Sequence, residues 1–320
     1  MSAPIVITHR SSIEFWSAMR VYLQTSRYLG TYDTRRRDTA HALRRLEIGG
    51  APRASASPLP EGCTLPLHIM VRDANLRPRD RALVAHVCSA ALPSSSFVGV
   101  GEELFVSTPE LAFLQMAETL SVVELVRLGF DLCGSYALAS DGALLCDRPA
   151  VTSVERLRRF ATKAEGTRGR RRALRACAFV RDGSASPRET QLAMLLCLPC
   201  NLGGYGLPPA RLNHRVDVPA LGGEARFFVC DLYWPEHRLD VEYDSTEFHA
   251  GPEALASDSA RRTRLEAIGV RSINFTNAHL LDARLFDGAA RDLLRIMRRR
   301  FRPRPGFEER HRELRRRLGL

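Results

Sequence analysis

FFVCDLYWPEHRLDVEYD, residues 227–244, reads as two strands joined by a tight turn. With the turn centred on residues 236–237, Asp231 lies directly opposite Glu242. Because side chains alternate between the two faces of a strand, Asp244 falls on the same face as these two residues. Like charges placed opposite one another destabilise a sheet. We therefore expect a hard divalent cation, Mg²⁺ or Mn²⁺, among the three carboxylates.

The same alternation assigns Cys230 to the opposite face of the hairpin, together with an apolar set of side chains. That set comprises Phe228, Leu232, Leu239, Val241 and Tyr243. Asp240 shares the carboxylate face, but it pairs near Tyr233, toward the turn. We interpret it as a solvated residue at the edge of the sheet, outside the cation site.

Length and composition indicate a globular chain with two domains. The 320 residues are enough for two cores, and 45% of them are hydrophobic. No apolar run reaches the length of a membrane span, and the first residues lack the basic-then-apolar pattern of a signal peptide. The eight cysteines are scattered, and the CxxC at Cys197 and Cys200 has no second pair at zinc-ribbon spacing. We expect a cytoplasmic protein without structural zinc.

The chain is strongly basic, with a formal net charge of +11 and an isoelectric point near 9.8. Lys163 is the only lysine, and every other basic residue except histidine is arginine, a bias that GC-rich coding explains for the most part. The excess of positive charge predicts an anionic partner. Nucleic acid is the leading candidate, because each phosphate that a basic side chain neutralises releases counterions.

Three segments follow one another along the chain. Residues 1–150 alternate short strands and helices and form an N-terminal α/β domain whose role the sequence does not reveal. Residues 151–182 form a basic helical linker, which either contacts phosphates or is a solvated charged helix face. Residues 183–320 form a second α/β domain with an arginine-rich tail. The last thirty residues hold twelve arginines against four acidic residues.

Hydrophobic periodicity and turn residues predict the order helix, three strands, helix, strand, helix in the second domain. These helices are expected at 187–198, 252–268 and 287–301, and the strands at 212–218, 226–234, 238–244 and 270–275. In the first domain, strands are expected at 4–7, 67–71, 96–100 and 104–106, and helices at 11–24, 108–120 and 122–132. Pro303 and Pro305 are expected to separate two short helices in the tail.

Several motifs of the second domain follow one another at a recognisable spacing. They are Ser186-Pro187-Arg188-Glu189, Val229-Cys230-Asp231, Val241-Glu242-Tyr243-Asp244, His249, and Asp258 with Arg261 before Leu265-Glu266-Ala267-Ile268-Gly269. This ordered set, within residues 183–282, resembles the DUF559 endonuclease-like domains. Those domains are similar to very-short-patch-repair endonucleases of the PD-(D/E)xK nuclease superfamily. The resemblance implies a restriction-endonuclease-like αβββαβ core beside the separate N-terminal α/β domain.

The resemblance also implies roles for five residues. Asp231, Glu242 and Asp244 would hold a Mg²⁺ or Mn²⁺ ion, Glu189 would complete the acidic cluster from the preceding helix, and His249 would stand near the nucleophilic water. The implied reaction is metal-assisted hydrolysis of a phosphodiester bond. In it the ion stabilises charge on the phosphate and lowers the pKa of a bound water.

Two of these residues have simpler alternatives. Ser186 and Glu189 also fit a capping box, in which the glutamate only closes the N-terminus of its own helix. His249 also fits an ordinary loop. Asp244 stands where the superfamily has its signature lysine, and no lysine lies within residues 183–320. Proton transfer is then left to His249 or to a metal-bound hydroxide, because arginine holds its proton at any accessible pH.

We therefore expect a metal-dependent DNA endonuclease that acts in defence or DNA repair and contacts the phosphate backbone through arginines. The alternative is a non-catalytic DNA-binding or regulatory module of a toxin–antitoxin type system, and a third option is a nuclease directed at RNA. Residues 105–114, FVSTPELAFL, resemble a strand-to-helix motif of abortive-infection antitoxin proteins. That likeness implies a regulatory or DNA-recognition role for the first domain.

Overall fold

The computed structural model divides into two compact units, Met1–Asp182 and Gly183–Leu320, and each is described by itself. The residues it describes are 5–22, 62–100, 104–139, 141–218, 226–244 and 252–320. Both units combine helices with a mixed sheet, so the predicted α/β class is confirmed. In the described part of the chain, no helix has the length and apolar character needed to cross a membrane.

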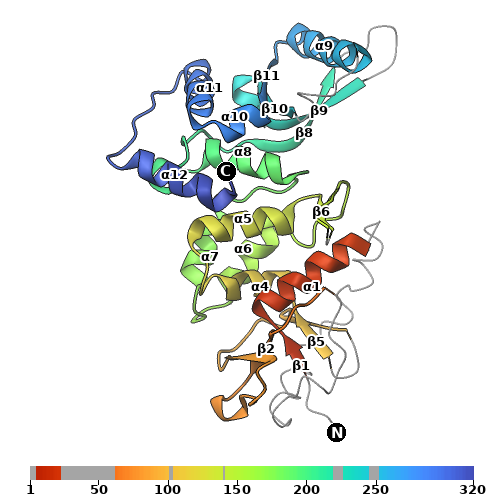
Figure 1. Ribbon diagram of the computed structural model, residues 1–320, viewed down its shortest axis with the longest axis vertical. Helices are drawn as coiled ribbons and strands as arrows, with labels where there is room; N and C mark the ends of the chain where they lie inside the picture. Colours follow the sequence, from red (N-terminus) through yellow and green to blue (C-terminus); the bar gives the residue numbers. More distant parts are fainter. Residues whose placement is uncertain (1–4, 23–61, 101–103, 140, 219–225, 245–251) are drawn as a thin grey trace. The chain divides into compact units, whose positions relative to one another are not determined.

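The first unit is built on a five-stranded sheet in the order β3-β2-β1-β5-β4 (Figure 1). Its strands are β1 (Ile5–Ile7), β2 (Leu67–Val71), β3 (Leu83–Val87), β4 (Phe97–Gly99) and β5 (Leu104–Ser107). The central strand β1 runs parallel to β5 and antiparallel to β2. Its three side chains are buried because strands flank it on both sides and helices cover the sheet.

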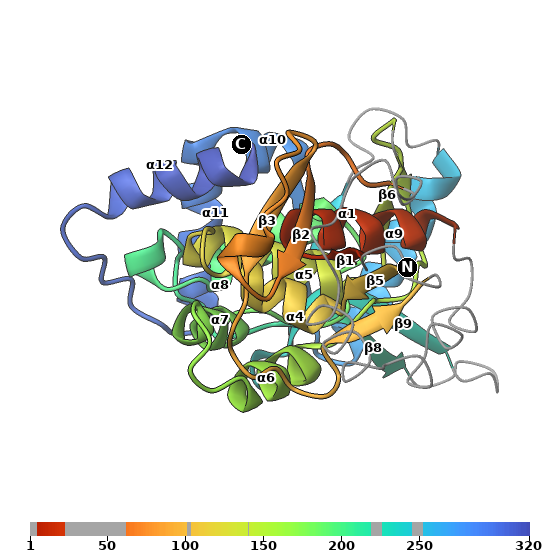
Figure 2. The same cartoon turned by 90° about the horizontal axis from the view of Figure 1, so that it is seen from below.

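Helices α1 (His9–Tyr22) and α4 (Pro109–Met116) pack against this sheet, and α5 (Val122–Cys133) packs against α4 (Figure 2). Helix α4 begins as predicted. Thr108 is its N-cap and accepts a hydrogen bond from the backbone N–H of Leu111, and Pro109 occupies the first helical position. A second cap, the capping box of Ser121 and Glu124, starts α5.

The expected basic linker belongs to the first unit. It contains α6 (Val154–Lys163) and α7 (Arg170–Cys177), which pack against each other and against α4 and α5. Their inward faces are apolar, because Leu157, Ala173 and Ala176 are buried. The arginines therefore lie on amphipathic helices of a folded unit rather than on a free-standing connection.

The second unit contains a four-stranded sheet in the order β11-β10-β9-β8. Its strands are β8 (Arg211–Val218), β9 (Arg226–Trp234), β10 (Leu239–Asp244) and β11 (Arg271–Thr276). Strand β9 runs antiparallel to both of its neighbours, β8 and β10, whereas β11 runs parallel to β10. Helices α8 (Pro187–Cys197) and α9 (Pro252–Ala267) lie on opposite sides of this sheet (Figure 1).

Several features of the fold differ from the predictions. Strand β3, the short hairpin of β6 (Ala137–Leu138) and β7 (Leu144–Leu145), and the short helix α10 (Asn277–Leu281) were not expected. Helix α11 (Ala283–Ile296) starts four residues early, because Asp282 caps it. Pro303 and Pro305 separate α11 from α12 (Phe307–Leu318), as predicted, and α12 packs against α8.

We predict that the arginine-rich tail stabilises the second unit through its apolar face. Leu314 in α12 is 1% exposed, so Leu314→Ala should lower the free energy of unfolding by about 2–5 kcal/mol. Urea denaturation followed by circular dichroism measures this. The control is Arg312→Ala, an exposed position on the same helix, which should change stability by less than about 0.5 kcal/mol. Equal effects of the two changes would show that α12 does not pack as described.

Candidate functional site

The hairpin of β9 and β10 has the predicted register. Leu239 pairs with Trp234 and Val241 pairs with Leu232, which confirms the turn position. Beyond this point Asp231 departs from a regular ladder. Its Oδ2 atom accepts a hydrogen bond of 2.8 Å from the backbone N–H of Tyr243. The Asp231 carboxylate is therefore held at the edge of β10 by a main-chain donor.

Strict alternation of side chains breaks at Asp231. Cys230 and Tyr233 are three residues apart, yet both belong to one core cluster, which alternation would forbid. In the neighbouring strand, Asn213 adopts a left-handed φ of 45°, and the pairing passes from Leu212–Leu232 to His214–Cys230. Both strands are thus irregular at the same level, although the register is unchanged and neither strand carries an extra residue. This irregularity explains why the prediction for Cys230 was wrong.

Cys230 shares a face with Glu242 and Asp240. The Cys230 sulfur and one carboxylate oxygen from each acid lie within 4.8 Å of one another. Among the described residues this is the group of three side chains that could hold a metal ion. It differs from the predicted triad, because Glu242 is the only residue common to both.

Asp240 is fully buried, so its interpretation as a solvated edge residue was wrong. Strand β11 covers it: Ser272 pairs with Asp240 and donates a 3.0 Å hydrogen bond to its Oδ2 atom. The Oδ1 atom has no hydrogen-bond donor in the described part of the chain. The carboxylates of Asp240 and Glu242 lie close together, and a hydrogen bond between them needs a shared proton, because neither carboxylate is a donor when ionised.

Burial sets the electrostatics of this group. It raises the pKa of Glu242 to about 9, with the charge of Asp240 as the second cause. Burial also raises the pKa of Asp231 to about 7, followed by the charges of Glu242 and Glu189. The pKa of Asp240 is raised, again mainly by burial. Near neutral pH these carboxylates therefore retain protons unless a positive charge stabilises their ionised forms.

Arg261 of α9 supplies one such charge. Its Nη2 atom forms an ion pair with Glu242 and donates a 2.5 Å hydrogen bond to the carbonyl oxygen of Val229. The guanidinium carbon lies 5.7 Å from the ring centroid of Phe228. Arg261 is thus fixed by three contacts from β9 and β10.

The remaining predicted residues have different surroundings. Asp244 is half-buried at the end of β10, where it pairs with Thr276. Glu189 is buried, and its Oε2 atom accepts hydrogen bonds from the Ala185 N–H (2.8 Å) and the Asn213 amide (2.6 Å). The bond from Ala185 agrees closely with the alternative that Glu189 caps its own helix. The charge of Glu189 nevertheless contributes to the raised pKa of Asp231. His249 lies outside the described residues.

Sequence reasoning missed Cys230 and Asp240 for distinct reasons. Asp240 was placed on the correct face, but its burial depends on the parallel pairing with β11, thirty residues away. No strong sequence signal predicts the irregular backbone that places Cys230 on the same face as Glu242. The asparagine at position 213 is a weak sequence signal of this irregularity, since asparagine tolerates the left-handed conformation better than most residues.

The donor set fits a hard divalent ion held by carboxylates. Asp240 brings a buried oxygen without a hydrogen-bond donor, and Glu242 brings a carboxylate with a raised pKa. Asp231 is near enough for its pKa to be raised by the charge of Glu242, but it is not one of the three residues whose ligand atoms converge. Oxygen donors of this kind suit Mg²⁺ or Mn²⁺. Burial also raises the pKa of the Cys230 thiol, so it stays protonated and is not counted as a ligand.

Comparisons with known proteins give limited similarity. No protein-family model matches the chain, and no solved structure matches it significantly. The chain is 31% identical over 159 residues to "Uncharacterized protein MT2308" and to "Uncharacterized protein Rv2248", from two strains of Mycobacterium tuberculosis. The match covers 49% of this chain and 52% of each relative, so the chain spans about half the length of these curated relatives.

We predict that Asp240→Asn stabilises the chain in EDTA at pH 8. Wild-type stability should fall as pH rises from about 4 to 9, because the folded state retains protons on raised carboxylates that the unfolded state has lost. The asparagine removes one buried charge and keeps an acceptor for Ser272. A gain of about 1 kcal/mol at pH 8 is expected, and little change at pH 4.

Urea titrations at both pH values measure this difference. Asp217→Asn is the matched control, because Asp217 is an exposed strand residue of the same sheet. It should change stability little at either pH. A loss of stability for Asp240→Asn that is the same at pH 4 and pH 8 would contradict the electrostatic account.

Proposed function

We propose that the second unit is a metal-dependent endonuclease-like domain that hydrolyses phosphodiester bonds in DNA, with a role in defence or repair. The observation that carries this proposal is the convergence of Asp240 and Glu242, with Asp231 nearby, on buried strands of a small sheet. In this chain of net charge +11, such a group of acids has no evident role in binding DNA by itself. A divalent ion gives it one.

The topology supports the same proposal. The elements α8, β8, β9, β10, α9 and β11 follow in the order helix, three strands, helix, strand. The sheet order β11-β10-β9-β8, with one parallel pair at β10 and β11, suits the αβββαβ core implied by the resemblance. The carboxylates lie on β9 and β10, the two central strands, where helices cover both faces.

The proposed roles follow from the environment of each residue. Asp240 and Glu242 would hold the ion, which would polarise the scissile phosphate and lower the pKa of a bound water. Asp231, with a pKa near 7, can accept or release a proton at neutral pH. This property supplies a proton acceptor that needs no lysine. We also propose that Asp244, at the end of β10, is a further ligand of the ion, and that His249 stands near the nucleophilic water.

One observation favours a second candidate, a non-catalytic DNA-binding or regulatory module of a toxin–antitoxin type system. The ion pair between Arg261 and Glu242 already provides a positive charge next to the carboxylates. In such a module Arg261 would serve permanently as the counter-charge. The pKa of Glu242 is nevertheless raised to about 9 with Arg261 in place, so one guanidinium does not fully stabilise the ionised group.

We predict that the chain cuts plasmid DNA in Mg²⁺ or Mn²⁺ and that EDTA abolishes the cutting. Asp231→Asn and Glu242→Gln should each slow cleavage at least about 100-fold, because they remove a proton acceptor or an ion-binding carboxylate. Agarose gels of supercoiled plasmid measure nicking and linearisation. The control is Glu236→Gln, in the turn of the same hairpin, where the side chain is exposed.

Two results would decide between the candidates. Salt-sensitive DNA binding without cutting under any divalent ion would contradict the nuclease and support the non-catalytic module. A labelled RNA of the same sequence, tested side by side, separates a DNA enzyme from a nuclease directed at RNA. Loss of cutting by Glu236→Gln as severe as by Glu242→Gln would show that the carboxylate group is not the site.

A further inference from the structure

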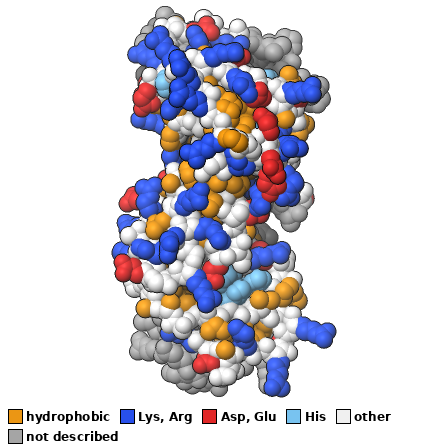
Figure 3. Space-filling model, turned by 90° about the vertical axis from the view of Figure 1, so that its left-hand side faces the viewer, with side chains coloured by type: hydrophobic (Ala, Val, Ile, Leu, Met, Phe, Trp, Pro, Cys, Tyr) orange, Lys and Arg blue, Asp and Glu red, His pale blue; other side chains and the backbone are white. Residues whose placement is uncertain are grey.

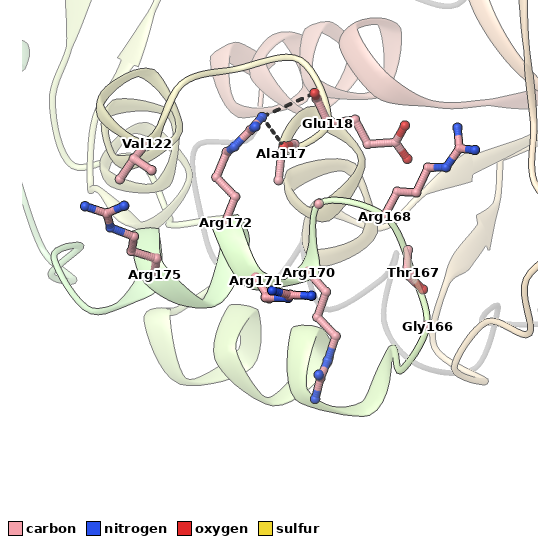
Figure 4. Close-up of a pocket in the computed structure, with 11 residues that line it drawn as sticks. Ala117, Glu118, Val122, Gly166, Thr167, Arg168, Arg170, Arg171, Arg172 and Arg175 are labelled. Carbon is pink, nitrogen blue, oxygen red and sulfur yellow. Dashed lines mark hydrogen bonds between the residues drawn. The ribbon is translucent and has the colours of Figure 1, made fainter.

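An open groove of about 930 Å³ lies in the first unit, whereas Asp231, Asp240 and Glu242 belong to the second unit. It is formed by the loop before α7, the first turns of α7, the end of α4 and the start of α5 (Figure 4). Five arginines line it: Arg168, Arg170, Arg171, Arg172 and Arg175. Glu118 is the one acidic residue of the described lining.

Two of these arginines stabilise the groove itself. Arg172 donates through Nη1 to the carbonyl oxygens of Ala117 (2.7 Å) and Leu120 (3.0 Å), in the connection between α4 and α5. Arg170 extends toward α6 and donates to the carbonyl oxygens of Ala161 (3.0 Å) and Thr162 (3.1 Å) (Figure 4). These contacts fix the loop against its neighbours.

The other three arginines do not stabilise the groove through such contacts. Arg168, Arg171 and Arg175 are exposed, and they form no hydrogen bond or ion pair within the described residues. Arg171 and Arg175 are four residues apart on α7, so like charges stand on neighbouring turns and destabilise the helix slightly. Their charges are available to an external anion.

The start of α7 strengthens this positive potential. Its first three residues are all arginines, although cations are unfavourable at the positive end of a helix dipole. Gly169 occupies the N-cap position with a φ of 77°, and no side chain caps the helix. The first backbone N–H groups of α7 thus have no side-chain acceptor. A bound anion would relieve both the charge repulsion and the missing cap.

The arginine-rich tail is only partly paired. There, Arg295 pairs with Asp292, and both Arg316 and Arg317 pair with Glu313, whereas other tail arginines are exposed and have no such partner within the described residues: Arg298, Arg299, Arg300, Arg302, Arg304 and Arg312. Basic side chains are scattered over the visible face of each unit (Figure 3), so exposure alone does not mark a site. What distinguishes the groove is a concentration of unpaired guanidinium groups around a hollow.

We propose that this groove binds the phosphodiester backbone of DNA. The choice of DNA as the anion rests on the proposed function, whereas the site itself lies in the other unit. Guanidinium groups form paired hydrogen bonds with phosphate oxygens. Three of them, distributed over a loop and two turns of a helix, suit successive phosphates of a polymer better than one small anion. The groove therefore retains the substrate without reading its sequence.

The test is fluorescence anisotropy with a labelled 20-base-pair duplex and the full chain in EDTA, at several salt concentrations. The groove variant carries Arg168→Gln, Arg171→Gln and Arg175→Gln. The matched control carries Arg77→Gln, Arg79→Gln and Arg81→Gln, which removes the same charge from exposed positions of the same unit. Circular dichroism melting of both variants establishes that each is folded.

We expect the groove variant to bind DNA at least about tenfold more weakly at low salt, and the control to change affinity less than about twofold. The slope of log K against log salt concentration should fall in magnitude by about 0.9 for each phosphate that the variant no longer neutralises. Equal weakening in both variants, or none in either, would overturn the proposal. If the triple variant fails to fold, Arg175→Gln alone should still weaken binding and reduce the slope.

Failure of this proposal and failure of the nuclease proposal are distinguishable. Binding is measured without divalent ions, so an inactive carboxylate group leaves the result unchanged. A chain that cuts plasmid but shows no difference between the two triple variants would retain the nuclease and lose the groove.

Discussion

The burial of negative charge on β9 and β10 is the constraint on which the second unit depends. Asp240 has no exposed surface, and Glu242 is close beside it. Carboxylates that leave water must be protonated, paired or bound to a cation, because an isolated buried charge is too costly. The fold uses two of these options, since Arg261 pairs with Glu242 and the raised pKa values keep protons on the acids near neutral pH. A divalent ion is the third option and the one with a chemical function.

The irregular backbone at Asp231 brings the group together. In two regular strands, the Cys230 side chain would face away from Glu242. The Asp231 side chain would lie next to Glu242 and would accept no hydrogen bond from the main chain. The departure from alternation instead ties Asp231 to the N–H of Tyr243 and leaves Asn213 free to bind Glu189. Helix α8 is thereby connected to the level of the sheet where the acids meet. An irregularity of this kind stabilises little by itself, but it determines which side chains share a face.

Much of the fold was predictable because it follows from local patterns. Capping residues, proline positions and apolar periodicity located most helices and the strands of the second sheet, and the hairpin register followed from its turn. The candidate site was predictable only in part. Glu242 was identified, and the closeness of Asp231 was anticipated, but the role of Asp240 depends on β11, and that of Cys230 depends on a backbone irregularity. Non-local pairing and left-handed backbone are the two features that alternation along one strand does not encode.

Proton release on metal binding tests the central claim most directly. If raised carboxylates hold protons that a divalent ion displaces, titration calorimetry with Mn²⁺ at pH 7 should show a heat that depends on the ionisation enthalpy of the buffer. We expect about one proton released per ion bound in the wild-type chain, and clearly less in Asp240→Asn. Binding without any buffer dependence, or no binding of Mn²⁺ at all, would contradict the claim that this group of acids is built to capture a cation.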